Sequence, residues 1–148
     1  MDPVQKKILI VEDEQLIREL YARQISRAGF FVKAVATAEE GLQTLVQGSF
    51  DLMLLDIMLP GMNGLQMYRQ FKLKNPGFNM PVILLTNLGQ ESVIKEGFEL
   101  GVSAYLIKSS YTPDQVVQEV KNVLEGKPTN PNPNSSPLSG GSPQGSLS

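Results

Sequence analysis

Two reactive residue types are missing from this 148-residue sequence, cysteine and histidine. The absence of cysteine excludes a disulfide framework, a thiolate nucleophile and a cysteine metal site, and it suits a reducing compartment such as the cytoplasm. The absence of histidine excludes the commonest general base and any phosphohistidine formed within the chain. Any phosphoryl group that the chain carries must therefore arrive from outside.

An excess of one charge and a long apolar run are also missing. The 13 basic residues nearly balance the 15 acidic ones, which leaves a formal net charge of -2 and no general attraction to nucleic acid or anionic membrane. Residues 1–7 lack the apolar run of a signal peptide, and no later run approaches the roughly 20 residues that span a bilayer. We therefore expect a cytoplasmic protein with no membrane span and no DNA binding by this chain.

The composition changes abruptly near Gly126. Residues 127–148 are mostly proline, asparagine, serine and glycine, and such a segment buries too little apolar surface to offset the entropy of ordering it. The sequence therefore predicts one domain over residues 1–126 and a disordered tail or linker over residues 127–148. Either the domain stands alone or an output domain once followed the linker, and the sequence leaves both open.

Within residues 1–126, apolar strand-like runs alternate with helical patterns at intervals of roughly 20 to 25 residues, which is typical of repeated βα units. Five units fit, so we predict an α/β fold with a five-stranded parallel sheet and helices on both faces. The third strand is predicted over Phe50–Leu55 and the fourth over Val82–Leu85.

Helices are predicted from apolar spacing and capping residues. The first, over 14–28, places Leu16, Ile17, Leu20, Tyr21 and Ile25 on one face and stops at Gly29. Thr37 and Glu40 are typical of a capping box before a second helix that buries Leu42, Leu45 and Val46. A fourth helix is predicted over about 90–100, and a fifth begins at the cap formed by Thr112 and Gln115.

Reactive side chains stand where the predicted strands end. Ile8–Val11 runs into Glu12 and Asp13, Leu52–Leu55 runs into Asp56, Val82–Leu85 into Thr86, and Tyr105–Ile107 into Lys108. Because the carboxyl ends of parallel strands meet at one sheet edge, we expect these side chains to converge there.

Three crowded carboxylates repel one another, so this cluster requires a cation or the lysine to offset its charge. The pattern therefore indicates a divalent metal beside a chemically active aspartate. Each residue also has an ordinary interpretation: Asp56 as a turn former, the pair Glu12 and Asp13 as a helix cap, and Lys108 as a solvated surface lysine. The joint arrangement at one sheet edge favours a site.

Residues 7–124 resemble the receiver domain of two-component response regulators. The resemblance rests on Glu12 and Asp13 after the first strand, Asp56 within the segment 56–64, Thr86 after the fourth strand, the aromatic Tyr105, and Lys108 after the fifth. It implies the flavodoxin-like (βα)5 fold with strand order 2-1-3-4-5.

The resemblance also implies the role of each residue. Asp56 would accept a phosphoryl group from a partner histidine kinase or histidine phosphotransfer protein, while Thr86 and Lys108 meet the phosphoryl oxygens. Mg²⁺ would be held by Glu12, Asp13, Asp56 and the backbone carbonyl of Met58. Such a domain is a phosphoacceptor with autocatalytic phosphotransfer and slow self-dephosphorylation rather than a conventional enzyme.

The same family pattern implies a two-state switch. Phosphorylation of Asp56 would draw Thr86 toward it and let Tyr105 turn inward, which alters the face made by the fourth helix, fifth strand and fifth helix. That face would bind an effector protein or a second copy of the chain, and its candidate residues are Lys95, Glu99, Ser103 and Tyr105.

Two positions of this chain differ from the family pattern, and two more are expected to influence how water reaches the phosphoryl group. Ser109 stands where the family commonly has a proline after a cis peptide bond, and Asn87 replaces a usually small residue. Met58 and Leu88 are both apolar, and we expect them to shield the phosphoryl group from water.

Three other classes of protein share parts of this pattern. A flavodoxin-like nucleotide binder needs a phosphate loop where this chain has three acids, Glu12–Glu14, and a haloacid-dehalogenase-like phosphatase typically has a second aspartate where this chain has Met58. A receiver-shaped interaction module that works without phosphorylation stays open as the main alternative.

Overall fold

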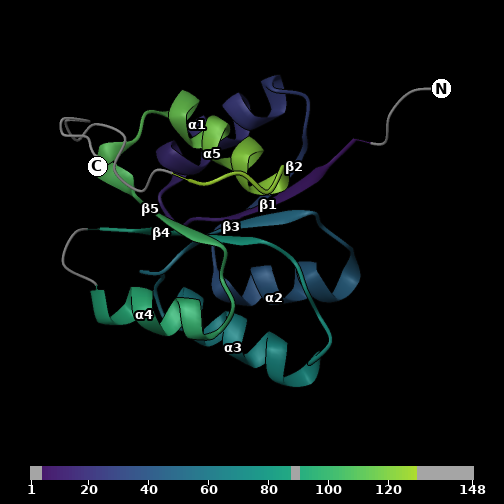
Figure 1. Ribbon diagram of the computed structural model, residues 1–148. Helices are drawn as coiled ribbons and strands as arrows, with labels where there is room; N and C mark the ends of the chain where they lie inside the picture. The colour runs from purple at the N-terminus through teal and green to yellow at the C-terminus, as the bar shows by residue number, and fades with distance from the viewer. Residues whose placement is uncertain (1–4, 88–90, 130–148) are drawn as a thin grey trace.

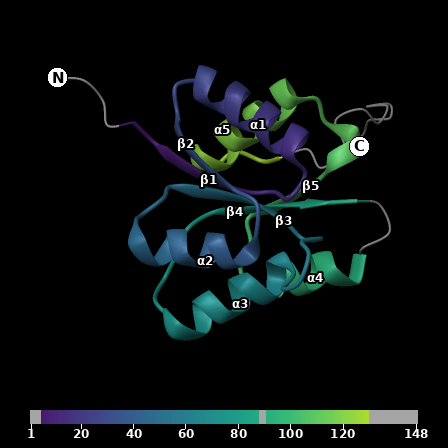
Figure 2. The same cartoon turned by 180° about the vertical axis from the view of Figure 1, so that it is seen from behind.

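The computed structural model describes residues 5–87 and 91–129, and it consists of one sheet between two layers of helices (Figure 1). Both views place α1 (Gln15–Arg27) and α5 (Pro113–Leu124) on one face of the sheet. The other face carries α2 (Ala38–Gln47), α3 (Gly64–Lys74) and α4 (Glu91–Glu99) (Figure 2). The predicted α/β layering is confirmed.

All strand pairs are parallel, and the order is β2-β1-β3-β4-β5, as predicted. The strands are β1 (Lys7–Val11), β2 (Phe31–Val35), β3 (Leu52–Asp56), β4 (Val82–Thr86) and β5 (Ala104–Ile107). Every residue of β3 and β4 is buried, which explains why these strands are continuous apolar runs rather than alternating ones. β3 begins two residues later than predicted and includes Asp56, so that carboxylate belongs to the strand itself.

Capping residues set most helix boundaries. Gly29, with φ of 104°, takes the left-handed conformation that ends α1, and Thr112 forms the predicted capping box with Gln115. Thr37 accepts a hydrogen bond from the Glu40 backbone N–H, but the Glu40 carboxylate accepts from Ala36 N–H rather than completing the box. A short 3₁₀ turn, η1 (Lys108–Ser110), follows β5.

Three predicted core positions prove to be exposed. Leu16 is 77% exposed, Leu20 is 41% exposed and Val46 is 76% exposed. At about 100° per residue, Leu16 lies on the opposite side of α1 from Ile25, which is fully buried. The sheet covers only a stripe of each helix, so the apolar arc predicted for α1 was too wide.

Each face of the sheet has its own hydrophobic core. Tyr21 and Ile25 of α1 and Val116 and Val120 of α5 pack on one face, while Leu65, Tyr68 and Phe71 of α3 pack on the other. These two cores hold the strands between them and so fix the positions of the strand ends.

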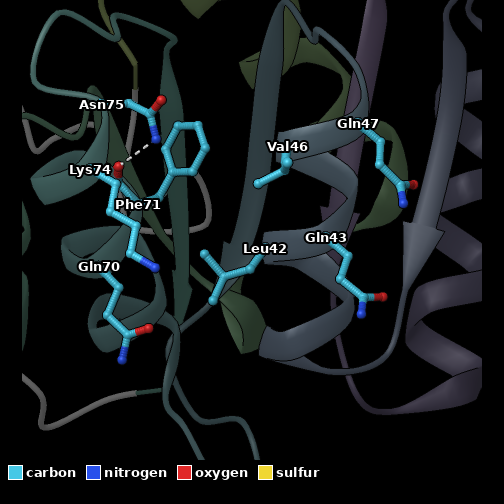
Figure 3. Close-up of a pocket in the computed structure, with 8 residues that line it drawn as sticks. All are labelled: Leu42, Gln43, Val46, Gln47, Gln70, Phe71, Lys74 and Asn75. Carbon is cyan, nitrogen blue, oxygen red and sulfur yellow. Dashed lines mark hydrogen bonds between the residues drawn. The ribbon is translucent and has the colours of Figure 1, made fainter.

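A groove lies between α2 and α3, with a volume of about 330 Å³ (Figure 3). Leu42, Val46 and Phe71 supply its apolar lining, and Gln43, Gln47, Gln70, Lys74 and Asn75 complete it. None of these residues belongs to the predicted site.

Two predictions fall on residues that the structure does not describe. Gln90, the expected start of the fourth helix, and most of the expected tail, 130–148, lie outside the described residues. In the described ranges, none of the helices combines the length and apolar character needed to cross a bilayer.

Candidate functional site

The carboxyl edge of the sheet brings three carboxylates together. Asp56 ends β3, and Glu12 and Asp13 directly follow β1, its neighbour in the sheet. One carboxylate oxygen from each of the three lies within 4.8 Å of the other two. Glu12 and Asp56 are almost completely buried, whereas Asp13 is more open to solvent.

Lys108, directly after β5, places its ammonium beside two of these acids and beside Glu14, the next residue after Asp13. Its Nζ lies 2.9 Å from Glu12 Oε1, 3.2 Å from Asp56 Oδ2 and 3.4 Å from Glu14 Oε1. The lysine side chain is only 10% exposed, so its charge is not dissipated into solvent. One ammonium thus offsets part of the charge of three carboxylates.

The Asp56 carboxyl group has an unusual proton affinity. Burial, together with the nearby Glu12 carboxylate, raises its pKa to about 7, although Lys108 and the Met58 N–H oppose the shift. That N–H donates to Asp56 Oδ1 at 3.0 Å. The Asp56 carboxylate therefore favours added positive charge in its surroundings.

Lys108 shows the reciprocal effect. Burial alone would lower the pKa of its ammonium, but the close Glu12 carboxylate and the charge of Asp56 outweigh burial and raise that pKa above its usual value. Lys108 consequently stays charged at physiological pH and serves as a fixed cation at the sheet edge.

The β3–α3 loop packs closely against the backbone of Asp56. The Gly64 N–H donates to the Ile57 carbonyl at 3.0 Å, and a Cβ at Gly64 would lie only 2.2 Å from the Asp56 carbonyl oxygen.

Asn63 and Gln66 form a capping box at the start of α3, which the sequence reasoning missed although the three-residue spacing signals it.

Thr86 lies at the same edge, but Tyr105 does not. Thr86 is fully buried at the end of β4, one residue after Leu85, the register partner of Asp56, and its hydroxyl donates to the Asn87 carbonyl at 3.0 Å. Tyr105 lies within β5, half-buried, and its ring meets Phe98 of α4 edge-on at a centroid distance of 6.1 Å.

The structure describes three of the four positions at which this chain differs from the family pattern or adjusts it, namely Met58, Asn87 and Ser109. The Lys108–Ser109 peptide is trans, as are the others in the described ranges, so this chain does not reproduce the cis bond that the resemblance implies. Met58 is 56% exposed, and Asn87 is also exposed. Leu88, the second residue expected to shield the phosphoryl group, lies outside the described residues.

Sequence reasoning also missed the contact made by Glu14. For Glu14 the sequence indicates only a repulsion of phosphate, yet its carboxylate pairs with Lys108 from the exposed rim of the cluster. The third acid in the run was the available signal, but only the folded geometry shows which cation it faces.

The donor set fits a hard divalent cation. Glu12, Asp13 and Asp56 offer carboxylate oxygens close enough to share one ion, and the cluster contains no sulfur or imidazole donor. Magnesium binds through a few carboxylates and retains several waters, which suits a cluster with one side open at Asp13.

The sheet order and the lysine-paired acidic edge together define a signalling domain of the receiver class. The model of the response regulator receiver domain family matches residues 8–121, so the chain belongs to this family. Membership implies phosphorylation-dependent signalling in a two-component system.

Curated relatives support the same assignment. The chain is 35% identical over 118 residues to the transcriptional regulatory protein ResD of Bacillus subtilis (strain 168), which is 80% of this chain and 48% of ResD. It is 40% identical over 102 residues to the transcriptional regulatory protein CusR of Escherichia coli (strain K12), which is 69% of this chain and 44% of CusR. The chain thus spans about half the length of these relatives.

A solved structure shares the fold closely. The CheY-like response regulator receiver domain protein from Methanospirillum hungatei JF-1 superposes with a TM-score of 0.75 at 29% sequence identity. The match covers 83% of this chain and 96% of that protein, so nearly the whole of that receiver domain protein aligns with this chain.

Proposed function

We propose that Asp56 accepts a phosphoryl group from a histidine kinase or a histidine phosphotransfer protein, and that the modification switches a protein-binding face. The observation that carries this proposal is the buried Asp56 carboxylate, 3.2 Å from Lys108 and close to the carboxylates of Glu12 and Asp13. A nucleophile, a fixed cation and a set of oxygen ligands therefore stand together.

In the transfer step, a carboxylate oxygen of Asp56 forms a bond to phosphorus as the bond from phosphorus to the donor nitrogen breaks, and the electron pair of that bond stays with the imidazole. No protein base is needed, because the attacking group would be the ionised carboxylate, the form that a bound cation favours. Lys108 meets one phosphoryl oxygen with its ammonium, and the Thr86 hydroxyl donates to another.

Glu12, Asp13, Asp56 and the Met58 backbone carbonyl are the proposed Mg²⁺ ligands. When bound, Mg²⁺ supplies positive charge to the phosphoryl oxygens. The raised pKa of Asp56 agrees with such a role, because its cause is burial and negative charge that a bound cation would offset.

The proposed switch joins Thr86 to Tyr105 and then to the α4–β5–α5 face. The edge-on contact between Tyr105 and Phe98 supports this route, since a rotation of Tyr105 must change the packing between β5 and α4. Lys95, Glu99 and Ser103 are exposed on this face and would contact an effector protein or a second copy of the chain.

The remaining proposals concern the domain boundary and the lifetime of the phosphoryl group. Residues 1–126 form the receiver domain of a cytoplasmic protein, residues 127–148 act as a tail or linker, and the output is a protein–protein contact.

Met58 and Leu88 shield the acyl phosphate, so it hydrolyses slowly. A half-life that stays unchanged in Met58→Asn combined with Leu88→Glu would contradict the shielding.

The test of the function is intact mass spectrometry after incubation with acetyl phosphate and Mg²⁺. We expect a single phosphoryl adduct on the wild type that requires Mg²⁺ and disappears in Asp56→Asn. An adduct that persists in Asp56→Asn would assign the modification to another residue. No adduct and no Mg²⁺ binding by the wild type would instead favour an interaction module that works without phosphorylation.

A further inference from the structure

Arg18 of α1 holds the backbone of the loop that carries two of the acidic residues. Its Nη1 donates to the carbonyl oxygen of Glu12 at 3.0 Å and to that of Asp13 at 3.2 Å. We propose that Arg18 is a positioning residue that aims the Glu12 and Asp13 carboxylates at a divalent cation. This inference rests on the proposed function, because it concerns the cation of the same site.

The two hydrogen bonds act on successive peptide planes. The Glu12 carbonyl belongs to the plane between residues 12 and 13, and the Asp13 carbonyl belongs to the plane between residues 13 and 14. Both planes that flank Asp13 are therefore held by one guanidinium. Because the direction of a Cα–Cβ bond follows from its flanking planes, the direction in which the Asp13 side chain leaves the backbone is fixed.

Glu12 is held in the same way by two different partners. Its N–H donates to the Val35 carbonyl of β2 at 3.1 Å, which fixes the plane before it, and Arg18 fixes the plane after it. The Glu14 N–H also donates to Glu12 Oε2 at 3.0 Å, which orients the Glu12 carboxylate itself. Arg18 thus completes a set of restraints on both acids through their backbone carbonyls rather than through their carboxylates.

The position of Arg18 in the helix explains its reach. It lies in the first turn of α1, and its backbone N–H bonds to the Glu14 carbonyl at 2.9 Å. Long side chains in helices point back toward the N-terminus, which directs the guanidinium of Arg18 toward the loop before the helix. The side chain is half-buried, so its donors are more restrained than those of a solvated arginine.

Positioning and simple electrostatics predict opposite changes in metal affinity. The positive charge of Arg18 repels a nearby cation, so removal of the charge alone would tighten Mg²⁺ binding. Loss of positioning would weaken Mg²⁺ binding instead, because groups that orient metal ligands typically contribute about 10- to 100-fold in affinity. The sign of the change therefore distinguishes the two roles.

The experiment measures Mg²⁺ dissociation constants by isothermal titration calorimetry for the full chain and four variants. We expect about tenfold weaker binding in Arg18→Met and in Arg18→Gln, and a smaller loss in Arg18→Lys, whose ammonium still donates to a carbonyl. Arg23→Met is the matched control, because it removes the same charge from an exposed position of the same helix and should leave binding nearly unchanged.

Unchanged or tighter Mg²⁺ binding in Arg18→Met would overturn the proposal, even if its melting temperature fell. If Arg18→Met does not fold, Arg18→Gln decides by the same criterion. The adduct assay on the wild type separates this inference from the function: a wild type with neither Mg²⁺ binding nor adduct contradicts the function itself. A normal wild type beside a variant with wild-type affinity contradicts only the role of Arg18.

Discussion

At the residue scale, Glu14 is the most accessible point of the Lys108 network. Its carboxylate lies 3.4 Å from Nζ and is 60% exposed, so it competes for Lys108 and repels an approaching phosphoryl donor. We predict that Glu14→Gln accelerates adduct formation with acetyl phosphate roughly two- to fivefold, the range expected for one exposed charge pair. Intact mass measured against time gives the rate.

Two controls belong to the Glu14 experiment. Glu19→Gln removes a carboxylate from the exposed surface of α1, where it accepts a hydrogen bond from Gln15, and it should leave the rate unchanged. The gain in Glu14→Gln should also shrink in high salt, since the Debye length falls to about 3 Å at 1 M ionic strength. A rate equal to wild type at low salt would exclude this role for Glu14.

The pKa of Asp56 predicts how stability depends on pH in Mg²⁺-free buffer. With a folded pKa near 7 and an ordinary value of 3.8, the folded state binds more protons than the unfolded state between these pH values. The contribution of Asp56 to the stability of the wild type therefore falls as pH rises from about 4 to about 7. Asp56→Asn lacks this loss, so we predict that its advantage in melting temperature grows between pH 5 and pH 8.

Thermal melts in EDTA at pH 5, 6.5 and 8 measure the advantage of Asp56→Asn, which we expect to reach roughly 5 °C at pH 8. Added Mg²⁺ should raise the melting temperature of the wild type more than that of the variant, because it binds the folded state with the intact carboxylate. A difference that does not change with pH would show that Asp56 titrates normally.

The sequence predicts where the site residues meet better than how they interact. Glu12 follows β1, Asp56 ends the neighbouring strand β3, and Lys108 follows β5, two strands further along the same parallel sheet. Their convergence at one edge therefore needs only the strand order and direction. The contacts of Glu14 and Arg18 depend on side-chain directions and peptide-plane orientations, which a linear pattern does not specify.

At the element scale, the join between β3 and α3 has no room for a side chain. A Cβ at Gly64 would lie 2.2 Å from the Asp56 carbonyl oxygen, and backbone cannot yield as a flexible side chain can. We predict that Gly64→Ala destabilises the protein by about 2 to 4 kcal/mol, toward the upper end of overpacking effects. Urea unfolding followed by circular dichroism measures this change.

Gly77→Ala is the matched control for the Gly64 substitution. A Cβ at Gly77 meets no atom within 4 Å, so this variant should be as stable as the wild type or slightly more stable, because alanine restricts the unfolded chain. Because Gly64 adjoins Asp56, we also expect slower adduct formation in folded Gly64→Ala. Equal stabilities for the two variants would contradict the steric argument.

Element boundaries show what the local pattern lacks. The pattern placed Asp56 after the third strand, but pairing with Leu85 of β4 extends β3 to include it. Likewise the apolar character of Leu16 and Val46 suggested burial, yet the sheet covers only part of each helix surface. Pairing and coverage are tertiary effects, so single-sequence periodicity sees neither.

At the scale of the whole molecule, the site depends on two cores that meet through the sheet. β3 and β4 contribute side chains to both cores, so the edge that carries Asp56 and Thr86 is restrained from each face. Such a framework suits phosphoryl transfer, which depends on held geometry rather than on mobile catalytic groups. Under the proposed function, the α4–β5–α5 side is the surface that we expect to meet a partner.

Residues 130–148 have no charged side chain and few apolar ones, so little free energy is available from packing them against the domain. We predict that a chain ending at Thr129 keeps the melting temperature of the full chain within about 2 °C and forms the Asp56 adduct at the same rate. A fall of more than about 5 °C would mean that the segment packs on the domain. The groove between α2 and α3 would then be the first surface to test, because Val46 is exposed in its lining (Figure 3). Val46→Ser in the full chain should lower the melting temperature by the same amount only if the segment binds in this groove.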